Sequence, residues 1–90
     1  MDAKASSPFD RRMTKSLQPL AEEIRRRREQ LGWSQEKLAD LCGFDRTYIS
    51  MLERGRRNPS FLNLLKLAAG LRTSVSELTE VYKHGTDANR

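Results

Sequence analysis

Apolar residues recur at three- and four-residue intervals through most of the chain, the spacing that places them on one face of an α-helix. The pattern covers residues 17–83, and no strand-like alternation or internal repeat breaks it. We therefore expect an all-α domain over these residues. Residues 1–16 and 84–90 are polar and lack periodicity, so they are expected to form a flexible N-terminal arm and a polar C-terminal tail.

The first predicted helix begins at Pro19, because proline suits the first turn of a helix. It runs to about Leu31, and Gly32 is its expected stop. Leu20, Ile24 and Leu31 share one face of this helix, which is therefore expected to pack against the rest of the domain.

The segment from Trp33 to Gly55 predicts two short amphipathic helices joined by a tight turn. Ser34 is a good N-cap for the first helix, and Asp45 can cap the second. Gly43 lies where the chain must turn sharply, in a conformation that only glycine adopts cheaply. Gly55 can end the second helix in the left-handed conformation. This arrangement is a helix-turn-helix, whose second helix can enter the major groove of DNA.

Two further helices are expected after this motif. Ser60 follows a turn and can cap a fourth helix, whose apolar residues are Phe61, Leu64, Leu65, Leu67 and Ala68. Ser74 and Glu77 form a capping box, a specific helix start signal. The fifth helix that follows has one apolar face made of Val75, Leu78, Val81 and Tyr82.

One charged residue interrupts the apolar face of the first helix. Arg28 stands one turn after Ile24, where an apolar residue is expected, and a charge that points inward needs a partner. Glu53 is the best candidate because it follows Ile49 and Leu52 on the inward side of the second motif helix. We therefore predict an Arg28–Glu53 ion pair that locks these two helices together.

Composition narrows the choice of function. The chain of 90 residues has a net charge of +5, which favours a polyanionic partner. Its single cysteine, Cys42, and single histidine, His84, form no nucleophile–base pair or metal-ligand spacing, so no enzyme, metal or cofactor is expected. No small-molecule ligand, membrane span or signal-peptide core is evident either, and a cytoplasmic protein is the default expectation.

The second motif helix, about residues 45–54, divides into an inward and an outward face. The outward residues expected to contact bases are Arg46, Thr47, Ser50 and Met51. Arg46 can bind a guanine, which gives about 1–3 kcal/mol of discrimination. The residues expected to contact the DNA backbone are Ser34, Gln35, Tyr48, Arg54, Arg56, Arg57 and Asn58. Gln35 is also expected to brace the start of this helix, and Tyr48 either packs and contacts phosphate or only packs.

Two surfaces outside the motif have open interpretations. The N-terminal arm is either plain disordered chain or a basic arm that touches phosphate or the minor groove; its cations are Lys4, Arg11, Arg12 and Lys15. A homodimer is expected, because one small domain binds a short site weakly. Its proposed interface is a patch that can equally be core covering the fourth helix: Leu71, Val75, Leu78, Val81 and Tyr82.

The sequence resembles the lambda-repressor-like helix-turn-helix domains, also called the xenobiotic-response-element type. The resemblance runs from about Leu20 to Leu78, and the residues that carry it are Ile24-Arg25, Arg28, Leu31-Gly32, Ser34-Gln35-Glu36-Lys37-Leu38-Ala39, Gly43, Tyr48-Ile49-Ser50, Leu52-Glu53-Arg54-Gly55, Arg57-Asn58-Pro59-Ser60 and Leu64-Leu65-Lys66-Leu67-Ala68. The run from Asp45 to Ser50 is especially similar to controller proteins of restriction-modification systems, although it also occurs in other regulators.

This resemblance implies a compact five-helix domain that binds palindromic operator DNA as a homodimer, and hence a transcriptional regulator of the repressor type. An interaction module, such as the antitoxin of a toxin–antitoxin pair, is the alternative. One departure concerns the fourth helix, which contains Gly70 and has Arg72 where members usually have glycine. Because glycine costs about 1 kcal/mol inside a helix, an irregular end of this helix is expected.

Overall fold

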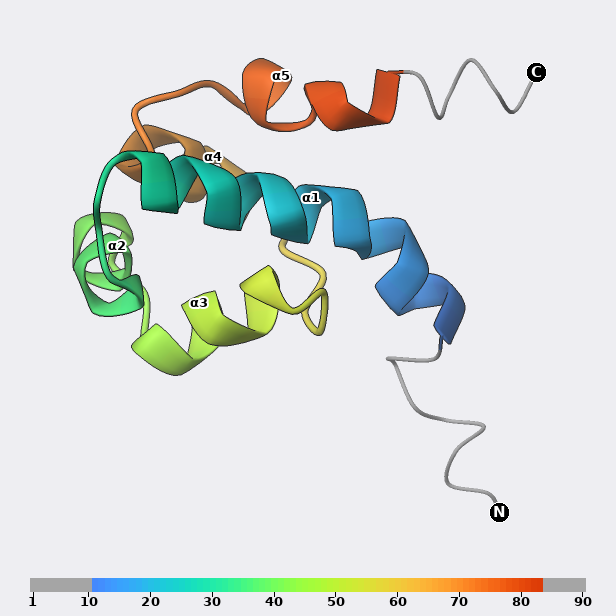
Figure 1. Cartoon of the computed structure of the whole chain (residues 1–90), viewed down its shortest axis with the longest axis horizontal. Helices are drawn as coiled ribbons and strands as arrows, with labels where there is room; N and C mark the ends of the chain where they lie inside the picture. Colours follow the sequence, from blue (N-terminus) through green and yellow to red (C-terminus); the bar gives the residue numbers. More distant parts are fainter. Residues whose placement is uncertain (1–10, 84–90) are drawn as a thin grey trace.

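The computed structural model describes residues 11–83, which fold into helices and turns without a strand. Figure 1 shows their order along the chain. The helices are α1 (Arg11–Gln30), α2 (Gln35–Cys42), α3 (Arg46–Glu53), α4 (Phe61–Gly70) and α5 (Val75–Leu78), followed by the 3-10 helix η2 (Glu80–Tyr82). The expected all-α, five-helix architecture is confirmed over this range.

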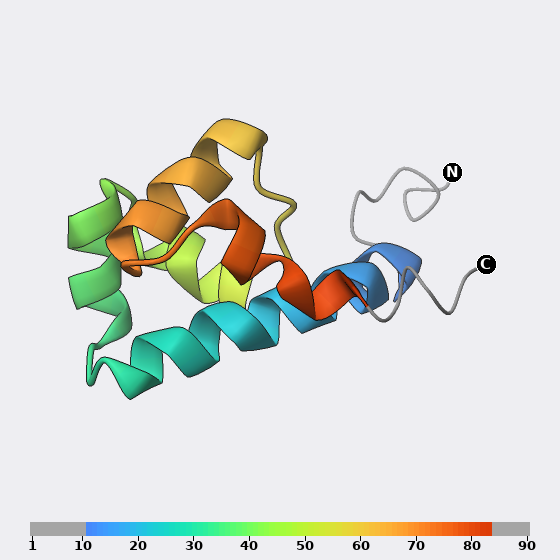
Figure 2. The same cartoon turned by 90° about the horizontal axis from the view of Figure 1, so that it is seen from above.

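The long helix α1 organises the arrangement of the others. Figure 1 shows α3 on one side of α1, with α5 and η2 on the other, and the view from above in Figure 2 shows α4 set across from α1. Each of the five helices contributes one side chain with 0% exposure to the common core: Ile24, Leu38, Ile49, Leu67 and Leu78. Helical periodicity placed all five on the apolar faces of their helices, and it left open whether Leu78 belongs to the core or to a dimer interface.

Local capping explains where the short helices begin. The side-chain oxygen of each predicted N-cap accepts a hydrogen bond from a backbone N–H of the first turn, which would otherwise lack a partner. The four pairs, each at 3.0–3.1 Å, are Ser34 with Lys37, Asp45 with Thr47, Ser60 with Asn63, and Ser74 with Glu77. These caps span only two or three residues, so the sequence alone could predict them.

The start of α1 differs from the prediction, since the helix begins at Arg11 and contains Pro19 in its interior. A proline inside a helix removes one backbone donor and disturbs the next hydrogen bonds. Here a side chain distant in sequence provides hydrogen-bond partners for the backbone groups that the bend leaves unpaired. The backbone N–H of Leu20 donates to the Tyr82 hydroxyl (3.2 Å), and that hydroxyl donates to the carbonyl oxygen of Ser16 (2.7 Å).

The expected N-terminal arm must therefore be corrected. Residues 11–16, which were assigned to a flexible arm, form the first turns of α1. Residues 1–10 and the predicted tail, residues 84–90, lie outside the described part of the chain. The basic side chains of Arg11, Arg12 and Lys15 are thus carried on a helix.

The end of α4 is explained by its contact with α2. Gly70 lies so close to Cys42 that a Cβ atom at this position would overlap the cysteine sulfur. The helix ends directly after it, and Arg72 adopts the left-handed conformation (φ 61°) while Thr73 N–H bonds to the Ala68 carbonyl oxygen (2.8 Å). The departure noticed in the sequence therefore has a structural reason. Glycine at position 70 leaves room for Cys42 of α2, and Arg72 adopts the left-handed conformation that ends the helix.

The proposed dimer patch is mostly an internal surface. Leu71 and Leu78 belong to the core, Val75 packs against it, and Tyr82 is bonded to α1, so only Val81 is largely exposed. The expectation of one continuous fifth helix is also wrong, because Thr79 separates α5 from η2. This segment covers α1 and α4, which is the alternative that the sequence left open.

Candidate nucleic-acid interface

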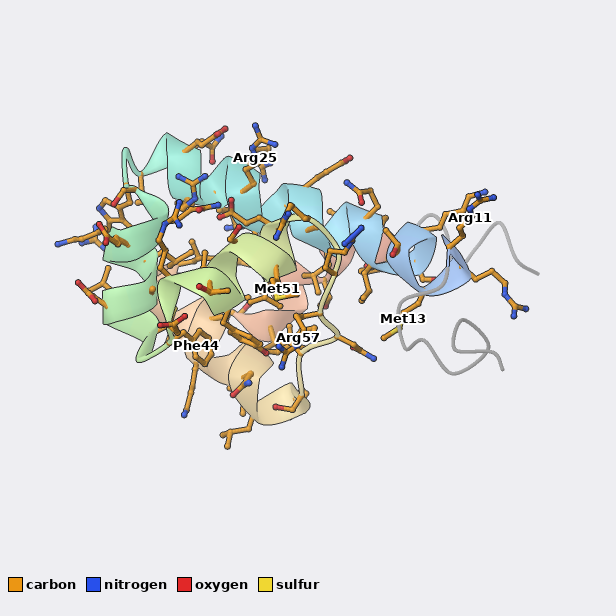
Figure 3. The ribbon with its side chains drawn as sticks, turned by 90° about the horizontal axis from the view of Figure 1, so that it is seen from below. Arg11, Met13, Arg25, Phe44, Met51 and Arg57 are labelled. Atoms are coloured by element: carbon orange, nitrogen blue, oxygen red, sulfur yellow. The ribbon has the colours of Figure 1, made fainter. Side chains whose placement is uncertain are left out.

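Helix α3 separates its side chains into a buried and an exposed face. Ile49 and Leu52 are buried against the other helices. Of the four residues expected to contact bases, Arg46 and Thr47 are exposed at the start of the helix, while Ser50 and Met51 are half-buried farther along. Figure 3 looks directly onto this face and shows Met51 on its surface. The helix thus offers a polar and basic surface that its own domain does not use.

The Arg28–Glu53 pair that the sequence predicted joins α1 to α3. Arg28 donates from Nε to one Glu53 carboxylate oxygen (2.6 Å) and from Nη2 to the other (3.0 Å). Its Nη1 group donates to the Trp33 carbonyl oxygen (2.7 Å), and the Gln35 amide donates to Glu53 (3.0 Å). Hydrogen bonding to Glu53 is the main cause that raises the pKa of Arg28 above its ordinary value. This network fixes the orientation of α3 relative to α1 and α2.

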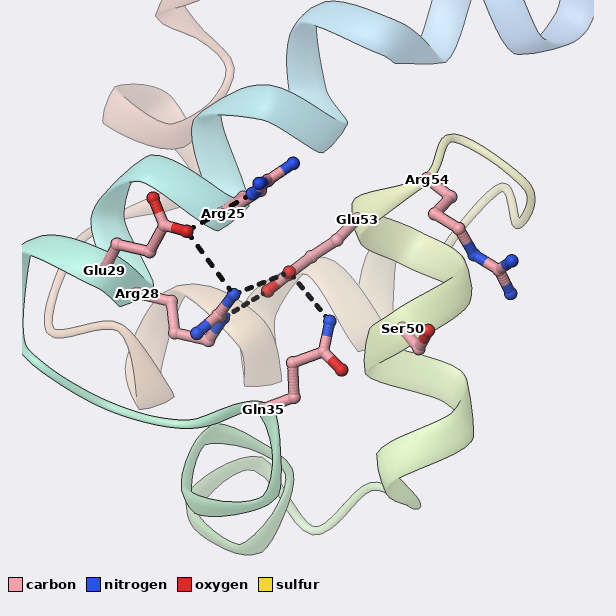
Figure 4. A pocket seen from close by; sticks show the side chains of 7 residues that line it. All are labelled: Arg25, Arg28, Glu29, Gln35, Ser50, Glu53 and Arg54. Carbon is pink, nitrogen blue, oxygen red and sulfur yellow. Dashed lines mark hydrogen bonds and ion pairs between the residues drawn. The ribbon is translucent and has the colours of Figure 1, made fainter.

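A hollow opens beside this network, between α1 and the outer side of α3. Figure 4 shows the side chains around it, and Arg54 points away from the buried ion pair toward the surface of α3. The lining residues are Arg25, Arg28, Glu29, Gln35, Ser50, Glu53 and Arg54. Arg25 is paired with Glu29 at 3.3 Å, whereas Arg54 is exposed. The hollow therefore adjoins the exposed face of α3, which contributes Ser50 to its lining.

The residues expected to contact the DNA backbone fall into two groups. Arg54, Arg56, Arg57 and Asn58 are exposed at and after the end of α3. Ser34 and Gln35 already have partners in the fold, since the Ser34 hydroxyl caps α2 and the Gln35 amide binds Glu53. From the sequence, Gln35 is expected to brace the start of α3. It instead braces the end of α3, where Glu53 lies.

Tyr48 is held by three neighbours. Its hydroxyl accepts a hydrogen bond from the Asn63 amide (3.0 Å), and its ring packs edge-on against Phe44 with centroids 4.9 Å apart. The Arg57 guanidinium lies over the same ring, 5.0 Å from its centroid. Sequence reasoning missed Asn63, because this residue lies 15 positions away on another helix and no local pattern links the two. The contacts hold Tyr48 and Arg57 at the edge of the α3 surface.

Three further properties of residues 11–83 concern metal binding, thiol reactivity and membrane spanning. This range contains no group of three His, Cys, Asp or Glu residues that could hold a metal ion. Burial raises the pKa of the Cys42 thiol to about 11, which makes it a poor nucleophile. Across the same residues, no helix has both the length and the apolar character needed to cross a membrane.

The sequence pattern of the helix-turn-helix family matches residues 24–78, more than half of the chain. The chain belongs to this family. A relative described as a hypothetical transcription factor from Neisseria meningitidis is 48% identical over 59 residues, which are 66% of this chain and 56% of that protein. The chain thus spans less than two thirds of that relative's length.

Solved structures of controller proteins share the helix-turn-helix fold. The restriction-modification controller protein C.AhdI from Aeromonas hydrophila is 44% identical, with a TM-score of 0.69 over 71% of this chain and 97% of that one. The controller protein C.Esp1396I, solved as a tetramer in complex with its natural operator, is 35% identical, with a TM-score of 0.68 over 74% of this chain and 90% of that one. The lambda-repressor-like resemblance seen in the sequence is confirmed.

Proposed function

We propose that this protein is a sequence-specific regulator of transcription that binds double-stranded DNA through α3. The observation that carries the proposal is the exposed face of α3, where Arg46 and Thr47 stand at the start of a helix fixed by the buried Arg28–Glu53 pair. An α-helix fits the major groove, where every base pair has a distinct donor and acceptor pattern. The net charge of +5 and the operator complex of the related controller support the same partner.

The proposal assigns two kinds of contact to the interface. Base contacts come from Arg46, Thr47, Ser50 and Met51. Phosphate contacts come from the exposed cations at and after the end of α3, with Ser34, Gln35, Tyr48 and Asn58 as polar neighbours. Phosphate contacts set the register of the protein on the duplex, and base contacts set the preferred sequence. This role requires no cofactor or catalytic step, and the cytoplasm is the compartment we propose for it.

We further propose that the protein binds a palindromic operator as a homodimer. Three large apolar side chains of α4 are exposed in the described part of the chain: Phe61 (66%), Leu62 (61%) and Leu65 (46%). They lie on one side of the helix at spacings of one, three and four residues. A second copy of this chain can cover them, which a two-fold symmetric pair would do with the same patch on both copies. The tetrameric state of the related controller on its operator supports assembly of this kind.

Selection of bound duplexes from a random pool, at near-physiological salt, tests the proposal. We expect a palindromic motif with half-sites about 10–11 base pairs apart. Arg46→Ala should then lose about 1–3 kcal/mol of specific binding and relax one base position, whereas Arg57→Ala should weaken all sequences similarly. A pool without enrichment would refute sequence-specific recognition, and equal effects of both variants on all duplexes would refute the role of Arg46.

A further inference from the structure

The first turns of α1 form a basic surface that the helix-turn-helix does not include. Arg11, Arg12 and Lys15 are exposed there, and residues 11–21 contain no aspartate or glutamate. Cations near the start of a helix oppose its dipole, so the charges of Arg11 and Lys15 do not stabilise α1 through that dipole. Their placement calls for another explanation, and a polyanion next to this surface would supply one.

One face of these turns packs against Gly55, just after the end of α3. A Cβ atom placed on Gly55 would lie 3.1 Å from the Gln18 side-chain oxygen and 3.4 Å from the Thr14 carbonyl oxygen, so α1 approaches α3 closely here. Arg11 and Lys15 lie three residues before Thr14 and Gln18, respectively, and therefore share their side of the helix. The contact places the side of the first turns that carries Thr14 and Gln18 against Gly55, where the basic loop after α3 begins.

The bend of α1 directs the same turns toward the recognition side of the domain. Figure 1 shows the first turns of α1 set at an angle to the rest of the helix and descending on the side where α3 lies. The bend occurs near Pro19, where the Tyr82 hydroxyl bridges the Leu20 N–H and the Ser16 carbonyl oxygen. A side chain inserted into the hydrogen-bond ladder is a recognised cause of a helix kink. The direction of the basic first turns of α1 therefore depends on Tyr82 of η2.

We propose that Arg11 and Lys15 form a second DNA-backbone contact, which binds phosphates flanking the base pairs read by α3, and that Tyr82 positions it. This inference rests on the proposed function and extends its binding site along the duplex. A phosphate is the chemical group that fits, because the surface is cationic and exposed. Each phosphate neutralised in this way releases condensed counterions and adds to the salt dependence of binding.

Salt titrations of single-charge variants test the contact. The probes are the duplex enriched by the selection and a truncated duplex that keeps the motif but lacks flanking base pairs. Arg11→Ala and Lys15→Ala should each reduce the slope of log affinity against log salt by about 0.9 on the long duplex. On the truncated duplex they should bind as the wild type does. Lys83→Ala is the matched control, because Lys83 is an exposed cation directly after η2. In Figure 1, η2 and α3 lie on opposite sides of α1.

A second variant separates positioning from direct contact. Tyr82→Phe keeps the ring and removes the hydroxyl bridge, so we expect a reduced salt slope on the long duplex while circular dichroism still shows a folded helical domain. In a background that already lacks both Arg11 and Lys15, the same substitution should change the slope no further. An additional loss there would overturn the positioning role of Tyr82.

The outcomes distinguish the two levels of the proposal. Slopes of Arg11→Ala and Lys15→Ala that equal that of Lys83→Ala would overturn the second contact while leaving recognition by α3 intact. A wild-type protein that enriches no duplex at all would instead overturn the proposed function on which this inference rests.

Discussion

Removal of Glu53 should destabilise the domain strongly, because this carboxylate is the partner of a largely buried charge. The Glu53 side chain is 3% exposed and that of Arg28 is 12% exposed. In Glu53→Ala, the Arg28 guanidinium loses two hydrogen bonds of 2.6 and 3.0 Å, and the Gln35 amide loses one of 3.0 Å. Arg28 then keeps its hydrogen bond to the Trp33 carbonyl oxygen and a long ion pair with the exposed Glu29 carboxylate (3.9 Å).

The expected loss is about 3–5 kcal/mol of unfolding free energy, the range measured when one partner of a buried ion pair is removed. Small domains have about 5–15 kcal/mol in total, so the change is a large part of the stability. A loss of 3 kcal/mol corresponds to a fall in Tm of roughly 12–24 °C for a domain of this size.

Urea unfolding followed by the fluorescence of Trp33, the single tryptophan, provides the measurement. The matched control is the double variant Arg28→Met, Glu53→Leu, since apolar replacement of both partners is often neutral or stabilising. We expect it to recover most of the stability that Glu53→Ala loses. A Glu53→Ala loss below about 1 kcal/mol, the value typical of exposed pairs, would refute the view that this pair locks α3 in place.

Three further predictions concern other contacts of the fold. Gly70→Ala should lower the unfolding free energy by about 1–3 kcal/mol, because the added methyl group overlaps the sulfur of Cys42 in the core; the double variant with Cys42→Ala should be closer to wild type in urea unfolding. With a pKa of about 11, roughly one Cys42 thiol in a thousand is ionised at pH 8, so alkylation of the folded protein should be far slower than that of the unfolded protein. The pKa of Glu23 lies below its ordinary value of 4.5, chiefly through hydrogen bonding to Arg26. Its stabilising contribution is thus present above pH 4.5 and lost as the pH falls below it, and Glu23→Gln should flatten the acid limb of the stability profile.

The helix-turn-helix could be predicted from sequence because its signals are local. Ser34 and Asp45 cap helices through bonds to backbone groups two or three residues away, and Gly43 takes the left-handed turn (φ 76°) between them. The two faces of α3 follow from helical spacing alone. Even the Arg28–Glu53 pair could be inferred, because Arg28 interrupts an apolar face and Glu53 lies on the inward side of its own helix.

The dimer patch shows the limit of this reasoning. Periodicity identifies an apolar face, but it cannot tell whether the same chain or another one covers it. Leu71 and Leu78 are buried by their own domain, whereas Phe61 and Leu62 on α4 remain exposed. Which face is left over depends on how five helices pack, and that is decided by the whole fold.

The sequence by itself determined the N-caps of α2 to α5, the turn of the motif and the residues on the outer face of α3, since these depend on interactions within a few positions. Only the tertiary structure decided that α1 begins before Pro19, at Arg11. The hydroxyl that accommodates the bend belongs to Tyr82, 62 residues from Leu20. It likewise decided the role of Gly70, which depends on Cys42 of another helix. Such contacts leave no periodic trace, because residues distant in sequence meet only when the helices pack.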